Sequence, residues 1–159
     1  MEFAPAGEII GAAHQVRTVS LADSRQLPDG DYRFIDMYCI DPSCDCRKTM
    51  IQVYRNDVLV STINFGWESR DFYQKWMGCP KDYDIAPAMA GASIDISSPD
   101  GVSPRGMLAF FNALLDDKWI AKFKTHYAAV KQRLAETRQQ EEDGSRTTPR
   151  TLRRVPRRK

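Results

Sequence analysis

The sequence predicts a single α+β domain, in which about three helices pack on one face of a small antiparallel sheet of three or four strands. Between residues 15 and 65, apolar and polar residues alternate in short segments that turn sequences separate. After residue 104, apolar residues recur at the spacing of amphipathic helices. Strands followed by helices are typical of the α+β class, and 159 residues suffice for one core.

The first half of the chain supplies the strands of a meander. The segment DYRFIDMYC has the clearest alternation, because its aromatic residues fall on one face of the strand and Cys39 falls on the other. The sequences Pro-Asp-Gly at 28–30 and Arg-Asn-Asp at 55–57 are typical of turns. The expected strands are 15–22, 31–39, 48–54 and 58–65. Residues 1–14 are mostly small and apolar, and we expect an irregular arm there.

The second half supplies the helices. Aromatic residues in GWESRDFYQKWM predict a short amphipathic helix near residues 67–77. Residues 78–104 contain four prolines and three glycines, which predicts a long loop. Helices are then expected at 104–115 and at 118–142, the second capped by Asp116 or Asp117 and stopped by Gly144. The core domain is therefore expected to span residues 15–142.

The composition is that of an ordinary globular protein, with 42% hydrophobic and 28% charged residues. The apolar runs are too short to cross a bilayer, and the N-terminal residues lack the pattern of a signal peptide. We therefore expect a cytoplasmic location and no membrane contact. In that compartment, clustered cysteines favour metal or redox chemistry over structural disulfides.

The positive charge is concentrated at the C-terminal end. Residues 145–159 hold seven basic and no acidic residues, whereas the other 144 residues hold 16 basic and 21 acidic residues, a net charge of −5. We expect a disordered basic tail over 143–159, able to contact nucleic acid or another polyanion weakly through released counterions. The residues expected to make this contact are Arg146, Arg150, Arg153, Arg154, Arg157, Arg158 and Lys159.

Three of the four cysteines fall within eight residues, in the sequence CIDPSCDC. Cys39 ends one predicted strand and Cys46 precedes the next, so a hairpin brings them together, and the Asp-Pro-Ser turn folds Cys44 toward the same space. Three converging thiolates supply three of the four ligands of a tetrahedral zinc site. Thiol redox chemistry and burial of inert cysteines remain the alternatives.

A zinc site of this kind needs a fourth ligand. His126 is the first candidate, because it lies on the apolar stripe of the last predicted helix, where a histidine needs a metal or a polar partner. Cys79 in the long loop is the alternative, and His14 is a further option.

The stretches CIDPSCDC, GWESRDFY and THYAAVK together resemble a group of uncharacterised bacterial proteins of similar size and unknown function. The likeness covers roughly residues 31–131. It implies one domain in which the cysteines and His126 belong to one pattern, and it implies no reaction. The SEC-C zinc motif differs, because Arg55 stands where that motif needs its third cysteine.

No catalytic residues are assigned, because the sequence lacks the nucleophile-elbow, P-loop and dinucleotide-binding motifs. The expected function is a binding or interaction module with a structural zinc ion and an unknown protein partner. The first alternative is a thiol redox sensor that uses Cys44 and Cys46. The second is a zinc-dependent hydrolase with an open metal position, which would also need a carboxylate beside the metal.

Overall fold

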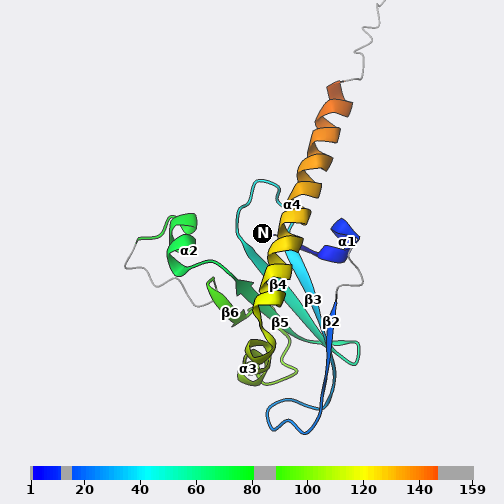
Figure 1. Cartoon of the computed structure of the whole chain (residues 1–159), viewed down its shortest axis with the longest axis vertical. Helices are drawn as coiled ribbons and strands as arrows, with labels where there is room; N and C mark the ends of the chain where they lie inside the picture. The colour runs from blue at the N-terminus through cyan, green and yellow to red at the C-terminus, as the bar shows by residue number, and fades with distance from the viewer. Residues whose placement is uncertain (1, 12–15, 81–88, 147–159) are drawn as a thin grey trace, which may run out of the picture.

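The computed structural model describes residues 2–11, 16–80 and 89–146 (Figure 1). The strands are β1 (Phe3–Pro5), β2 (Arg17–Leu21), β3 (Gly30–Cys39), β4 (Lys48–Arg55), β5 (Val58–Gly66) and β6 (Gly91–Ile94). The helices are α1 (Ala6–Ile10), α2 (Arg70–Met77), α3 (Pro104–Leu114) and α4 (Asp117–Arg146). The predicted α+β class is confirmed, and the described sheet has six strands where three or four were expected.

The additional strands come from segments that were expected to be irregular. The sheet order is β1-β3-β4-β5-β6, with β2 also paired to β3, and every pairing is antiparallel. The first strand adds to the end of β3, where Phe3 pairs with Cys39. Within the long loop after α2, Gly91 pairs with Gly66 to add β6 at the opposite edge. Both additions are short, so their sequences carry too few residues for a visible alternation.

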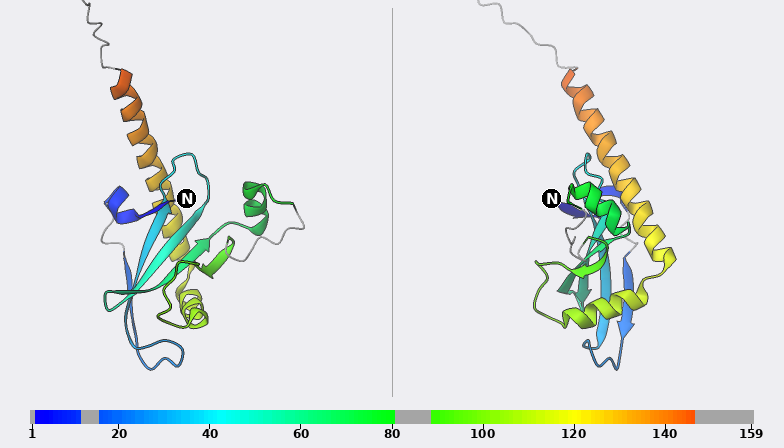
Figure 2. Two further views of the ribbon diagram at one scale, coloured as in Figure 1. Left: turned by 180° about the vertical axis from the view of Figure 1, so that it is seen from behind. Right: turned by 90° about the vertical axis from the view of Figure 1, so that its left-hand side faces the viewer.

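Alternation along the central strands sorts the side chains into two faces. Tyr32 and Phe34 on β3 are buried against α3 and α4 in the main core, together with Ile51 on β4. Tyr38 continues this face and contacts Val130 of α4 in a second apolar cluster. The side view shows α4 running along one side of the sheet (Figure 2). Cys39, the next residue after Tyr38, therefore points to the other face.

Capping residues mark the starts of α2, α3 and α4. The side chains of Ser69 and Ser103 accept hydrogen bonds from the first turns of α2 and α3, and Asp116 Oδ1 accepts from the amide of Trp119 at 2.8 Å. Gly78 ends α2 in the left-handed conformation that glycine favours. The expected ends of these helices are thus close to the observed ones, except at the end of α4.

The last helix extends farther than expected, through Gly144 to Arg146. Its final turns project beyond the sheet (Figure 1), and every side chain from residue 135 to 143 is exposed. Local pairs support this part, such as Arg138 Nε with Glu142 Oε1 at 3.1 Å. None of the described helices has the length and apolar character needed to cross a membrane.

Candidate metal centre

The predicted cysteine cluster forms in the structure. The sulfur atoms of Cys39, Cys44 and Cys46 all lie within 4.8 Å of one another. Cys39 is the last residue of β3, and Cys46 precedes β4 by two positions, so the β3–β4 hairpin brings both to one place. Within the part of the chain that the structure describes, no other group of three or more histidine, cysteine or carboxylate side chains is this close.

A compact turn delivers Cys44 to the other two sulfurs. Asp41 Oδ1 accepts hydrogen bonds from the amide and the hydroxyl of Ser43, at 2.8 and 2.7 Å. The amide of Cys44 donates to the carbonyl of Asp41 at 3.2 Å, which closes the turn. The expected role of the Asp-Pro-Ser sequence as a turn is therefore confirmed.

The three thiols differ in exposure. Cys39 and Cys46 are fully buried, whereas Cys44 is half-buried. Burial, with a further contribution from the nearby Cys44, raises the pKa of Cys46 to about 12. Burial also raises the pKa of Cys39, against the opposing effect of a backbone hydrogen bond at Asp41 and the charge of Lys131. These two groups are thus thiols at neutral pH without a metal, and a bound cation would have to displace their protons.

Two side chains of α4 bind the backbone of residues 39–47, here called the cysteine loop. Lys131 Nζ donates to the carbonyl oxygens of Cys39 and Asp41, at 3.1 and 2.6 Å. The hydroxyl of Tyr127 lies 3.3 Å from the carbonyl oxygen of Cys44. Neither residue was among those that the sequence indicated as site residues. The signal available was their four-residue spacing, which puts both on one side of the helix.

The other side of the loop is held from the region of α2. Tyr73 donates its hydroxyl to the carbonyl oxygen of Arg47 at 2.7 Å. Arg47 itself has a φ of 43°, and its guanidinium contacts Asp45 at 3.0 Å and Glu68 at 3.5 Å. Tyr73 fits there because Gly66 has no Cβ, which would lie 2.6 Å from the Tyr73 hydroxyl oxygen. The carboxylates of Asp45 and Glu68 are therefore engaged with an arginine.

The structure does not bring His126 to the three sulfurs. Its Nδ1 lies 2.6 Å from Asp36 Oδ2, and only 4% of the residue is exposed. The same carboxylate oxygen accepts a hydrogen bond from the hydroxyl of Tyr38 at 2.7 Å. Because Asp36 and Tyr38 lie on the helix-covered face of β3, His126 meets that face while Cys39 belongs to the other.

The remaining predicted residues lie away from the cluster or outside the described part. Cys79 is half-buried just after α2, where its amide donates to the carbonyl of Gln74 at 3.0 Å, and it does not join the three thiols. His14 lies outside the described residues. Of the basic residues expected to contact polyanions, Arg146 ends α4 and its side chain is not described, and the other six lie beyond the described residues.

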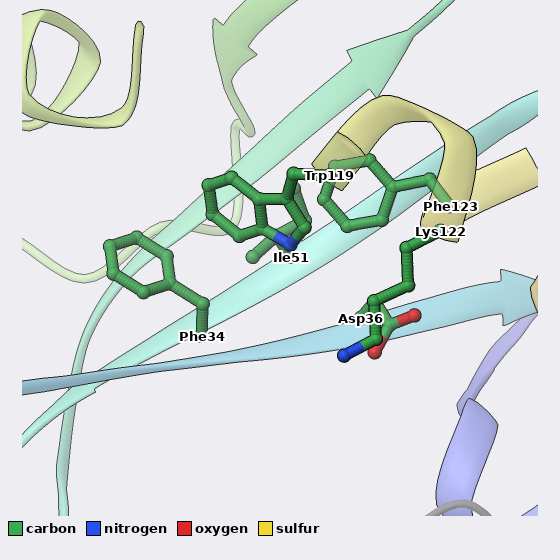
Figure 3. Close-up of a pocket in the computed structure, with 6 residues that line it drawn as sticks. All are labelled: Phe34, Asp36, Ile51, Trp119, Lys122 and Phe123. Atoms are coloured by element: carbon green, nitrogen blue, oxygen red, sulfur yellow. The ribbon is translucent and has the colours of Figure 1, made fainter. Parts of the chain in front are cut away.

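The space between Asp36 and the start of α4 is not a ligand pocket. Figure 3 shows Asp36 under the first turns of α4, next to Lys122 and to aromatic side chains of the core. These walls leave no room for even a water molecule. The histidine–aspartate pair therefore belongs to the packing between sheet and helix.

Comparisons with known proteins add no relative: no family model, no curated protein and no solved structure matches the chain. The fold and the site alone therefore define its class. It is an α+β protein with a cluster of three cysteines that can hold a metal ion.

Proposed function

We propose that the chain is a zinc-binding interaction module, in which Cys39, Cys44 and Cys46 hold the ion as thiolates. The approach of the three sulfur atoms to within 4.8 Å of one another carries the proposal. Zinc–sulfur bonds in a tetrahedral site place the sulfurs about 3.8 Å apart, so small shifts suffice to close the cluster around an ion. Thiolate ligands in a protein without haem or cluster motifs favour zinc over harder cations.

The ion would act structurally, as a cross-link at the end of the β3–β4 hairpin. The cysteine loop has no strand pairing of its own, and it receives hydrogen bonds from Lys131, Tyr127 and Tyr73. A metal bound to three points of this loop would fix the backbone carbonyls that these side chains contact. Metal binding would thereby stabilise the packing of α4 and α2 around the hairpin.

A binding role fits these residues better than a reaction does. A zinc hydrolase needs a carboxylate that is available for proton transfer beside the metal. The carboxylates of Asp45 and Glu68 both contact the guanidinium of Arg47, and the carboxylate of Asp41 accepts two hydrogen bonds from Ser43. The expected partner of the module is another protein.

Metal analysis tests the proposal. Protein purified without added zinc should carry about one zinc ion per chain, as a site of this stoichiometry requires. Cys44→Ser should lose the metal and lower the melting temperature, whereas the control Cys79→Ser should keep both. Folded protein that takes up no zinc, even when zinc is added, would refute the proposal.

The exposure of Cys44 supports a second candidate, a thiol redox sensor. Cys44 is half-buried and its sulfur lies within 4.8 Å of that of Cys46. Hydrogen peroxide would oxidise the two thiols to one disulfide and would itself be reduced to two water molecules. In a metal-free protein treated with hydrogen peroxide, a Cys44–Cys46 disulfide seen by peptide mass spectrometry would favour this function over zinc binding.

A further inference from the structure

The cysteine cluster supplies three ligands, one fewer than the four of a closed zinc site. Structural zinc sites have four protein ligands, whereas sites with three keep a position for another ligand. The described residues bring three sulfur atoms together and no fourth ligand atom. The two described candidates lie elsewhere, His126 against Asp36 and Cys79 at the end of α2.

The exposure of the cysteines shows where the remaining position would lie. Cys39 and Cys46 are fully buried, and only Cys44 has partial contact with solvent. A ligand that arrives from outside must therefore approach on the side of Cys44. Tyr127 and Lys131 of α4 border this side, since they contact the carbonyl oxygens of Cys44 and Asp41.

The charges around the loop favour a neutral ligand over an anion. A divalent ion with three thiolates carries one net negative charge, and Asp41 and Asp45 add two more. Of the nearby cations, Arg47 already contacts both Asp45 and Glu68, and Lys131 donates to two carbonyl oxygens. A further anion in this partly buried place would lack a cation of its own, which makes its desolvation costly.

We therefore propose that the metal bound by Cys39, Cys44 and Cys46 has a fourth position that a neutral imidazole-type nitrogen from outside the chain can occupy, on the side of Cys44. This inference rests on the proposed metal binding and goes beyond a closed structural site. A free imidazole compound and a histidine side chain of a partner offer the same chemistry. Water holds the position when neither is present.

Cobalt substitution of the full chain tests this inference. Co²⁺ replaces Zn²⁺ in tetrahedral thiolate sites, and its visible absorption changes when a ligand is exchanged. We expect titration with imidazole to change the spectrum saturably. Azide, a small anion, should bind at least about tenfold more weakly at constant ionic strength, a difference of about 1.4 kcal/mol. His126→Ala and Cys79→Ser should give the same titration as the unchanged chain.

The outcomes separate the inference from the proposed function. A chain that binds neither Co²⁺ nor Zn²⁺ refutes both. A chain that binds Co²⁺ but does not respond to imidazole refutes only the open position. A cobalt spectrum that changes in His14→Ala, His126→Ala or Cys79→Ser would then identify the internal ligand. Equal affinity for azide and imidazole would refute the preference for a neutral ligand.

The two sources of the nitrogen ligand can also be separated. A peptide that contains one histidine, compared with the same peptide carrying alanine, reports whether a polypeptide can reach the metal. Saturable binding of the histidine peptide alone would support a partner protein as the source, and no response to either peptide would restrict the site to small ligands.

Discussion

The imidazole of His126 on α4 lies against the carboxylate of Asp36 on β3, with Nδ1 2.6 Å from Oδ2. The hydroxyl of Tyr38 donates to the same oxygen and also lies 3.2 Å from the carbonyl oxygen of Phe123. These polar groups join the helix to the sheet inside an otherwise apolar contact. The histidine that the sequence suggested as a metal ligand thus has a structural partner within the core.

Removal of this histidine should cost stability and leave the metal in place. We expect His126→Ala to lower the free energy of unfolding by about 1–3 kcal/mol, because it removes the histidine partner of the largely buried Asp36 carboxylate. Urea denaturation measures the loss, and metal analysis of the same variant measures the zinc. A double-mutant cycle with Asp36→Ala should show coupling between the two residues. Loss of zinc from His126→Ala, with a loss of stability no larger than zinc removal causes in the unchanged chain, would instead make His126 the fourth ligand.

The stability of the metal-free protein should fall as the pH rises above about 8.5, where an unfolded cysteine ionises. Burial raises the pKa of Cys46 to about 12, so the folded protein keeps this proton while the unfolded chain loses it. The contribution of this thiol to stability is therefore fully present below the unfolded pKa. It declines between the two pKa values, by up to about 1.4 kcal/mol per pH unit.

Denaturation of the metal-free protein between pH 8 and pH 10, about the range in which an unfolded cysteine ionises, measures this decline. Cys46→Ala should have a shallower slope in the same range, which separates this thiol from the buried tyrosines. The zinc-loaded protein should not show this decline, because its thiolates carry no protons in the folded state, whereas the unfolded cysteines still bind protons below about pH 8.5. An unchanged slope in Cys46→Ala would contradict the assignment.

Gly66 is the glycine whose substitution should damage the site most directly. A Cβ there would lie 1.9 Å from the carbonyl oxygen of Met89 and 2.6 Å from the hydroxyl oxygen of Tyr73. Gly66→Ala should therefore displace both groups and lower the free energy of unfolding by about 1–3 kcal/mol. It should also weaken zinc binding, because Tyr73 donates to the carbonyl of Arg47 next to Cys46.

Gly101→Ala is the matched control for this substitution. Its Cβ would have its nearest neighbour, an atom of Val60, at 3.8 Å, which is an ordinary contact. Stability and zinc affinity should change little in this variant. A comparable loss in both variants, measured by chemical denaturation and by zinc competition with a chelator, would rule out the proposed steric cause.

Truncation after Gly144 tests the predicted contact with polyanions. It removes seven basic residues, from Arg146 to Lys159, and leaves a chain with a net charge of −5. Any binding to single-stranded DNA should weaken with rising salt in the full chain and disappear in the truncated one. Fluorescence anisotropy at several salt concentrations measures both. Salt-sensitive binding that survives the truncation would place the contact elsewhere.

Local sequence patterns were sufficient for much of this protein. The alternation in residues 31–65 predicted three central strands, because one face of each packs against the core. Asp116 marked the start of the last helix, because its carboxylate accepts a hydrogen bond from the amide of Trp119. The convergence of Cys39, Cys44 and Cys46 also followed from local structure, since a hairpin and one turn bring them together.

Only the tertiary structure shows which residues from distant parts of the chain contact the β3–β4 hairpin and its cysteine loop. Alternation already separated Cys39 from Asp36 and Tyr38. Only the packed fold shows that His126 of α4 pairs with Asp36 and does not join the three thiols. The contacts of Lys131 with the cysteine loop join residues about ninety positions apart. Strand pairing and helix docking determine such contacts, and both depend on the packing of the whole core. The sequence near each residue therefore does not predict them.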